Sequence, residues 1–146
     1  MASSYNIQVL RDGFRNFVVR VTGEVDMTTP ATADIPPTAL TTIATMSPPC
    51  LALRVDRVKY SLPHGCPLDV QLWWDATAPV LFWGMAGGDD TEASNFGGLT
   101  NNAGAGKTGN IKFSTSGATG QTAQAGVLWT FAVIVECTKL QVQVPL

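Results

Sequence analysis

Hydrophobic and polar residues alternate with a period of two along most of the chain, and this pattern predicts β-strands. The alternating stretches are rich in valine, isoleucine, threonine and aromatic residues, which favour an extended backbone. No stretch of about a dozen residues has apolar side chains at the i, i+3, i+4, i+7 spacing of an amphipathic helix. We therefore expect an all-β fold.

About eight segments combine this alternation with flanking turn residues such as glycine, proline, aspartate and asparagine. The predicted strands cover residues 5–10, 14–26, 40–45, 51–62, 68–74, 79–83, 110–116 and 127–139. Several short strands joined by turns and long crossovers are typical of two packed antiparallel sheets. We predict a two-sheet antiparallel β-sandwich with a jelly-roll-like topology, long loops and extended termini, formed as one domain over residues 1–146.

Two long segments do not fit a strand. Residues 27–39 contain three prolines, which exclude a central strand and predict an extended loop or arm. Residues 84–109 are rich in glycine and asparagine and are too long for an ordinary connection. We expect this second segment to be a functional or flexible loop.

The repeating apolar positions of the clearest strands predict the core. Cys137 shares a strand face with Val133 and Val135, so we expect a buried free thiol there. The odd number of cysteines and their wide spacing argue against a disulfide framework. The predicted core includes Phe17, Val19, Leu53, Val55, Leu72, Phe131 and Val133.

Aromatic residues provide the first candidates for an interaction surface. Trp73 and Trp74 are adjacent in one predicted strand, so they must point to opposite faces, and one of them cannot enter the same core. The outward ring is covered by a loop, stacked on a sugar or buried against another subunit. We select Trp74, Trp83 and Phe96 as candidate interface residues.

The C-terminal residues 140–146 supply the other candidates. Leu140, Val142 and Val144 alternate with glutamines, so an extended segment has one apolar side. Such an edge is paired in natural proteins, and we expect it to dock on a neighbouring chain or on its own sheet edge. The alternative is that it continues the strand at 127–139 within its own subunit.

Composition limits the classes of partner. Charged residues make up 14% of the chain, well below the roughly 25% of typical soluble domains. The net charge is −2 and the nine basic residues are scattered, so we expect no nucleic-acid partner. There is no signal peptide or long apolar run, so we expect no membrane partner and synthesis in the cytoplasm.

No convincing catalytic, cofactor-binding or metal-ligating motif is present. The segment from Gly104 to Thr108 resembles the end of a phosphate-binding loop, but Asn101 stands where that motif requires glycine, and a strand pattern follows in place of a helix. His64 is the single histidine, and the cysteines and carboxylates, including Asp89 and Asp90, lack the spacing of a zinc or catalytic site.

Three strings resemble small structural proteins encoded by tailed bacteriophages. They are residues 8–16 (QVLRDGFRN), 72–76 (LWWDA) and 95–104 (NFGGLTNNAG). Small β-sandwich proteins of such phages commonly serve as capsid decoration, or cement, proteins, which sit as trimers over junctions of the major capsid lattice. The resemblance implies a virion structural protein on the capsid exterior, with the major capsid protein and its own copies as partners. It assigns no individual contact residues.

Three other functions are considered, and two of them are compatible with the sequence. The chain is alternatively another phage head or tail component, or a glycan-binding module that uses an exposed tryptophan and the 84–109 loop. An enzyme of cupin-like shape is disfavoured because a cupin needs clustered histidines, and this chain has one.

Overall fold

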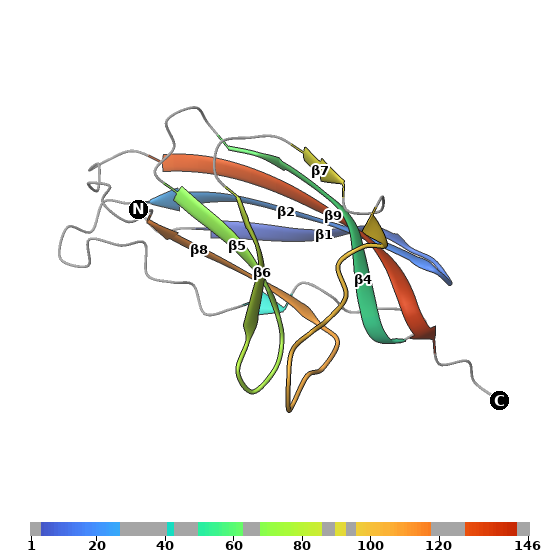
Figure 1. Cartoon of the computed structure of the whole chain (residues 1–146). Coiled ribbons are helices and arrows are strands. Elements are labelled where there is room, and N and C mark those ends of the chain that lie inside the picture. The colour runs from blue at the N-terminus through green and yellow to red at the C-terminus, as the bar shows by residue number, and fades with distance from the viewer. Residues whose placement is uncertain are drawn as a thin grey trace.

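The computed structural model describes residues 4–26, 41–42, 50–62, 68–85, 90–92, 96–117 and 128–142. Within these ranges the chain forms nine β-strands and no α-helix, which confirms the all-β prediction. The strands make two antiparallel sheets that lie against each other (Figure 1).

The larger sheet, sheet A, has five strands. In spatial order they are β1 (Ser4–Asp12), β2 (Asn16–Asp26), β9 (Leu128–Val142), β4 (Cys50–Ser61) and β7 (Asp90–Glu92). The long β9 lies in the middle, paired with β2 on one side and β4 on the other.

The smaller sheet, sheet B, has four strands. In spatial order they are β3 (Thr41–Thr42), β8 (Ile111–Gly117), β5 (Leu68–Trp74) and β6 (Val80–Met85). Strands β5 and β6 form a hairpin that closes through residues 75–79.

The strand pairs are nested in sequence. Strand β2 pairs with β9, β3 with β8, β4 with β7, and β5 with β6. Successive pairs alternate between sheet A and sheet B. From β2 to β9 the chain therefore runs as one long hairpin folded over on itself, and β1 is an additional strand beside β2.

The inward faces of both sheets form one hydrophobic core. All seven residues of the predicted core are buried, which confirms that prediction. Cys137 is a buried cysteine that forms no disulfide, also as predicted. The bulkiest buried side chains come from both sheets, Trp74 and Phe113 from sheet B and Phe17 from sheet A. Full burial of each large apolar side chain stabilises the fold by about 1.5–3 kcal/mol, so the core accounts for most of the stability.

The observed strands differ from the predicted ones at three places. Strand β7 lies inside the predicted 84–109 loop, β3 is described only at two of the six residues expected at 40–45, and β9 continues past residue 139 to Val142. The predicted arm at 27–39 lies outside the described residues.

Candidate functional site

The two adjacent tryptophans of β5 point in opposite directions, as alternation requires. Trp74 faces the core, where its ring stacks on Phe82 with centroids 4.1 Å apart. Trp73 faces outward, and its indole Nε1 donates a hydrogen bond of 2.9 Å to Ser114 Oγ. The selection of Trp74 as an interface residue is therefore corrected, because its side chain is buried within its own chain. Trp73 is the outward ring.

The edge strand β6 carries a shallow hollow of about 250 Å³, which we call the β6 hollow. It is lined by Leu81, Phe82, Trp83 and Gly84. Leu81 is 45% exposed, and a side chain added at Gly84 would meet no atom within 4 Å. Trp83 itself is partly buried and packs against the core of its own chain, opposite Leu72 of β5.

Trp83 also has an incompletely satisfied polar atom. Its indole Nε1 is buried and has no hydrogen-bond partner among the described residues. Buried donors of this kind are uncommon in proteins, because leaving one unpaired costs about 1–3 kcal/mol. Trp83 therefore packs on the core with a donor that no described group satisfies.

Phe96 is the most exposed of the described large hydrophobic residues, at 87%. It precedes Gly97 and Gly98, both of which have a positive φ. Two backbone hydrogen bonds of 2.8 and 2.9 Å join Leu99 to Val55, so this loop is attached to the edge of β4. The loop therefore presents Phe96 to solvent from a fixed base.

A side-chain network supports the base of the Phe96 loop. A Cβ at Gly98 would lie 2.5 Å from Arg54 Cγ, so the backbone there packs directly on the arginine side chain. Arg54 Nε donates to Asp56 Oδ1 at 2.8 Å, and Thr138 Oγ1 donates to Asp56 Oδ2 at 2.6 Å. Only glycine allows this close approach at φ +81°.

Residues 100–110 are fastened to the β5–β6 hairpin around Asp75. The Asp75 carboxylate accepts a hydrogen bond from Thr108 Oγ1 at 2.6 Å and pairs with Lys112 Nζ at 2.9 Å. Backbone hydrogen bonds join Asp75 to Thr108 and Asn110. Burial raises the pKa of Asp75, but the Thr108 hydrogen bond and the Lys112 charge together bring it below the ordinary value of 3.8.

The segment from Gly104 to Thr108 leads into strand β8. A phosphate-binding loop leads into a helix, whereas the strand expected after this segment is confirmed. Within the described part of the chain, no group of three histidine, cysteine, aspartate or glutamate residues lies close enough to hold a metal ion. His64 and Asp89 lie outside the described residues.

The C-terminal candidates lie partly in β9. Leu140 pairs with Ala52, and Val142 pairs with Cys50, so both belong to sheet A of their own chain. The alternative interpretation, that the segment continues the preceding strand, is therefore right for residues 140–142. Val144 lies outside the described residues.

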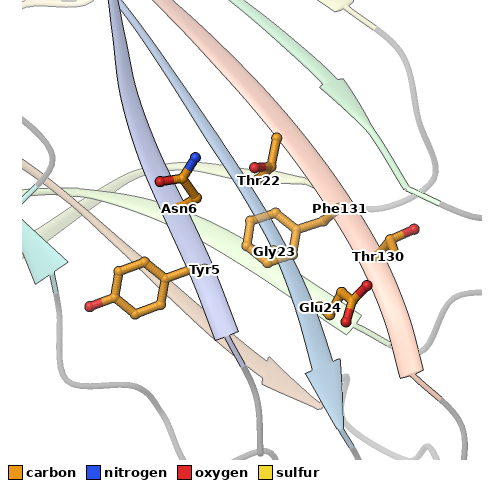
Figure 2. A pocket seen from close by; sticks show the side chains of 7 residues that line it. All are labelled: Tyr5, Asn6, Thr22, Gly23, Glu24, Thr130 and Phe131. Carbon is orange, nitrogen blue, oxygen red and sulfur yellow. The ribbon is translucent and has the colours of Figure 1, made fainter.

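A second, larger hollow of about 370 Å³ lies at one end of sheet A. Figure 2 shows that its side chains come from three adjacent strands, β1, β2 and β9. It is lined by Tyr5, Asn6, Thr22, Gly23, Glu24, Thr130 and Phe131. The hollow therefore combines aromatic rings with hydroxyl, amide and carboxylate groups.

Sequence reasoning missed a buried ion pair between the first and last strands. The Lys139 side chain is 0% exposed and its Nζ contacts Asp12 Oδ1. The alternation of the strand could have predicted it, because Lys139 continues the inward series of Val133, Val135 and Cys137. Burying a charge is costly without a partner, so Asp12 is what permits a lysine at this inward position.

The outward faces of the two sheets differ in charge. Five of the nine lysine and arginine residues lie on the outward face of sheet A, together with three described carboxylates. These are Arg11, Arg20, Arg54, Arg57 and Lys59, and Glu24, Asp56 and Glu136. On sheet B the outward strand positions include two charged residues, Lys112, which is paired with Asp75, and Asp69, which lies opposite Ser116.

The chain matches no protein-family model, no curated protein and no solved structure. Among the described residues no helix is long and apolar enough to span a membrane. The fold and the surfaces above are therefore the basis of any functional conclusion.

Proposed function

We propose that the chain is a non-enzymatic virion structural protein, which binds and stabilises the assembled capsid shell of a tailed phage as a decoration protein. The observation that carries this proposal is the nested pairing of the strands. Two sheets made by folding one long hairpin are what a jelly-roll-like β-sandwich requires. Jelly rolls recur in viral capsid domains, lectins and cupins.

The sparsely charged outward face of sheet B supports a role in assembly. Leu81 is 45% exposed on this face, Lys112 is paired with Asp75, and Asp69 is the other charged residue at an outward strand position. A partner that covers this face has few ions to desolvate, and desolvation of ions is the main cost of burying polar surface. Association over this face is thus favoured over association across the charged face of sheet A.

The proposal includes the partners and the location. The major capsid protein is the binding partner, the protein acts as a homotrimer on the capsid exterior, and assembly takes place in the host cytoplasm. Binding to the assembled shell alone stabilises the shell by mass action. Three copies that bind together turn weak single contacts into a tight one through avidity.

Binding to capsid shells tests this function directly. Shells are prepared from a phage whose gene for this protein is deleted, and the purified protein is added at increasing concentration. We expect saturable co-sedimentation with the shells, no binding to unassembled capsid subunits, and a higher temperature of shell disruption. Absence of binding, or equal binding to free subunits, would contradict the proposal.

A glycan-binding module is the second candidate, and the hollow in Figure 2 favours it. Tyr5 is 45% exposed beside the polar groups of Asn6, Thr22 and Glu24, and sugars bind through stacking and hydrogen bonds to such groups. Titration with a glycan panel, followed by intrinsic fluorescence, tests this function. Saturable binding that Tyr5→Ala abolishes would favour it over the capsid role.

A further inference from the structure

We propose that Lys139 and Asp12 condense after the chain has folded, so that an amide bond joins strand β9 to strand β1 within one molecule. The two residues form the buried ion pair between these strands. The proposed function makes no use of this pair. The cross-link is therefore independent of the capsid role, and either one can fail without the other.

The fold brings the two reacting groups into contact. Lys139 Nζ lies against Asp12 Oδ1, although 127 positions separate the two residues in the chain. The backbone is fixed on both sides of the contact. Lys139 N donates a hydrogen bond of 2.6 Å to Arg15 O, and the turn after Asp12 is closed by a backbone hydrogen bond of 2.9 Å from Gly13 to Asn16. Groups held together in this way react as if at a very high local concentration.

Burial makes the amine of Lys139 a nucleophile. The Lys139 side chain is 0% exposed, whereas the Asp12 side chain is 20% exposed. Charges are poorly solvated in such a place, so transfer of one proton along the contact, from the ammonium to the carboxylate, costs less than it does in water. The transfer leaves a neutral amine beside a neutral carboxylic acid, and these are the reactants for an amide.

The condensation balances without an oxidant, a reductant or any other reactant. The lone pair of Lys139 Nζ attacks Asp12 Cγ and forms the new C–N bond. A proton then passes from Nζ to the hydroxyl oxygen of the acid, the C–O bond breaks, and one water leaves through the exposed part of Asp12. The product favours the folded chain, because a neutral amide replaces two charges that are costly to bury.

The bond secures a strand at the edge of the fold. Strand β1 ends the order of sheet A and pairs with β2 on one side, while β9 lies in the middle of the sheet. A covalent link that closes a loop of 127 positions lowers the conformational entropy of the unfolded chain. The cross-link therefore opposes separation of β1 from the rest of sheet A.

A second pair of lysine and aspartate provides an internal comparison. Lys112 Nζ lies 2.9 Å from Asp75 Oδ1, but these side chains are 22% and 15% exposed. Water reaches the ammonium of Lys112 and stabilises its charge, so the amine is not released for attack. We expect this pair to stay ionic. Burial of the amine, and not contact alone, selects Lys139.

The mass of the purified native chain tests the proposal directly. The denatured chain should weigh one water less than its sequence requires, a loss of about 18 Da. Lys139→Met should have the full mass of its own sequence, while Lys112→Met, in the ionic pair, is the matched control and should keep the loss. A native chain of full mass would overturn the proposal. So would a loss that Lys139→Met retains, because Asp12 would then have cyclised on the backbone of Gly13.

Digestion with trypsin, which cuts after lysine and arginine, locates the bond in the native chain without any variant. A chain without the bond releases residues 12–15 and residues 113–139 as separate peptides. Acylation of the Lys139 amine blocks cleavage at that lysine. The cross-linked chain should therefore yield one branched peptide that joins residues 12–15 to residues 113–146. Release of the two separate peptides from the folded native chain would show that the pair is ionic and that the proposal is wrong.

Discussion

The outward faces of the two sheets cover the same core, yet they have different chemistry. Sheet A carries arginine, lysine and carboxylate side chains, several of them joined in pairs such as Arg54 with Asp56. Sheet B has only two charged residues at its outward strand positions, Asp69 and Lys112, and Lys112 is paired with Asp75; Trp73 and Leu81 lie among them. The core requires only the inward positions, so this difference is not a requirement of folding.

The contrast indicates which face is adapted for contact. A charged face keeps its water, because removing water from ions costs more than most contacts return. A neutral face with half-exposed apolar side chains can be covered at little cost, and such patches mark interaction sites. The chain as a whole has few charged residues, and most of them lie in the strands of sheet A. The outward faces of the two sheets therefore differ more in charge than the overall composition indicates.

The largest expected loss of stability comes from replacing the inward tryptophan of β5, and it tests which face of sheet B is outward. Trp74→Ala should lower the free energy of unfolding by about 3–5 kcal/mol, because it leaves a cavity beside Phe82 in the core. Trp73→Ala should lower the free energy of unfolding by only about 1.5 kcal/mol, because the variant loses one hydrogen bond to Ser114 and the contacts of a partly buried ring. Urea unfolding of both variants measures the difference. Equal losses would contradict the contrast, and a larger loss for Trp73→Ala would mean that the two rings have been placed on the wrong faces.

The sequence predicted the core better than the edges. In β2 and β9 every second residue is apolar over a long run, so the period alone identifies the inward face. Strand β7 has the sequence Asp-Thr-Glu, which carries no apolar alternation. Its pairing with the edge of β4 depends on the folded chain, and local sequence contains no signal for it.

The tryptophan assignment could have been made from the sequence. Leu72 was placed in the core, and Trp74 is two residues further along the same strand, so the period of two also sends it inward. Phe96 is different, because a lone phenylalanine in a glycine-rich loop has no period to place it. The position of its loop depends on the pairing of Leu99 with Val55, which local sequence does not predict. A contact of Phe96 with a partner stays a prediction.

A smaller effect concerns the one ionic cluster described on sheet B. Asp75→Asn keeps an acceptor for Thr108 but loses the charge that Lys112 pairs with, so it should cost about 1.5 kcal/mol near pH 7. The pKa of Asp75 is lowered in the folded chain, so its contribution is present above 3.8 and is lost as the pH falls through the folded pKa.

The measurement for Asp75 is urea unfolding as a function of pH. The gap between the native chain and Asp75→Asn should narrow as the pH falls from about 7 to about 3. Glu24→Gln, at an exposed carboxylate on sheet A, is the control and should change stability little at any pH in this range. A gap that is independent of pH would show that the charge of Asp75 contributes nothing.

The smallest effect is expected on the charged face of sheet A. Arg57 Nε lies 3.9 Å from Glu136 Oε2, too far for a hydrogen bond, and although these two atoms are buried, the side chains are 36% and 39% exposed, so solvent weakens the pair. Arg57→Met keeps most of the aliphatic stem, and it should lower the free energy of unfolding by no more than about 0.5 kcal/mol.

A double-mutant cycle with Glu136→Gln, measured at low and high salt, isolates the pair from other contacts of the arginine. We expect a coupling energy that is small at low salt and absent at high salt. A coupling above about 1.5 kcal/mol that persists in salt would show that charge on sheet A holds the fold together, and the contrast between the two faces would then reflect stability and not partner binding.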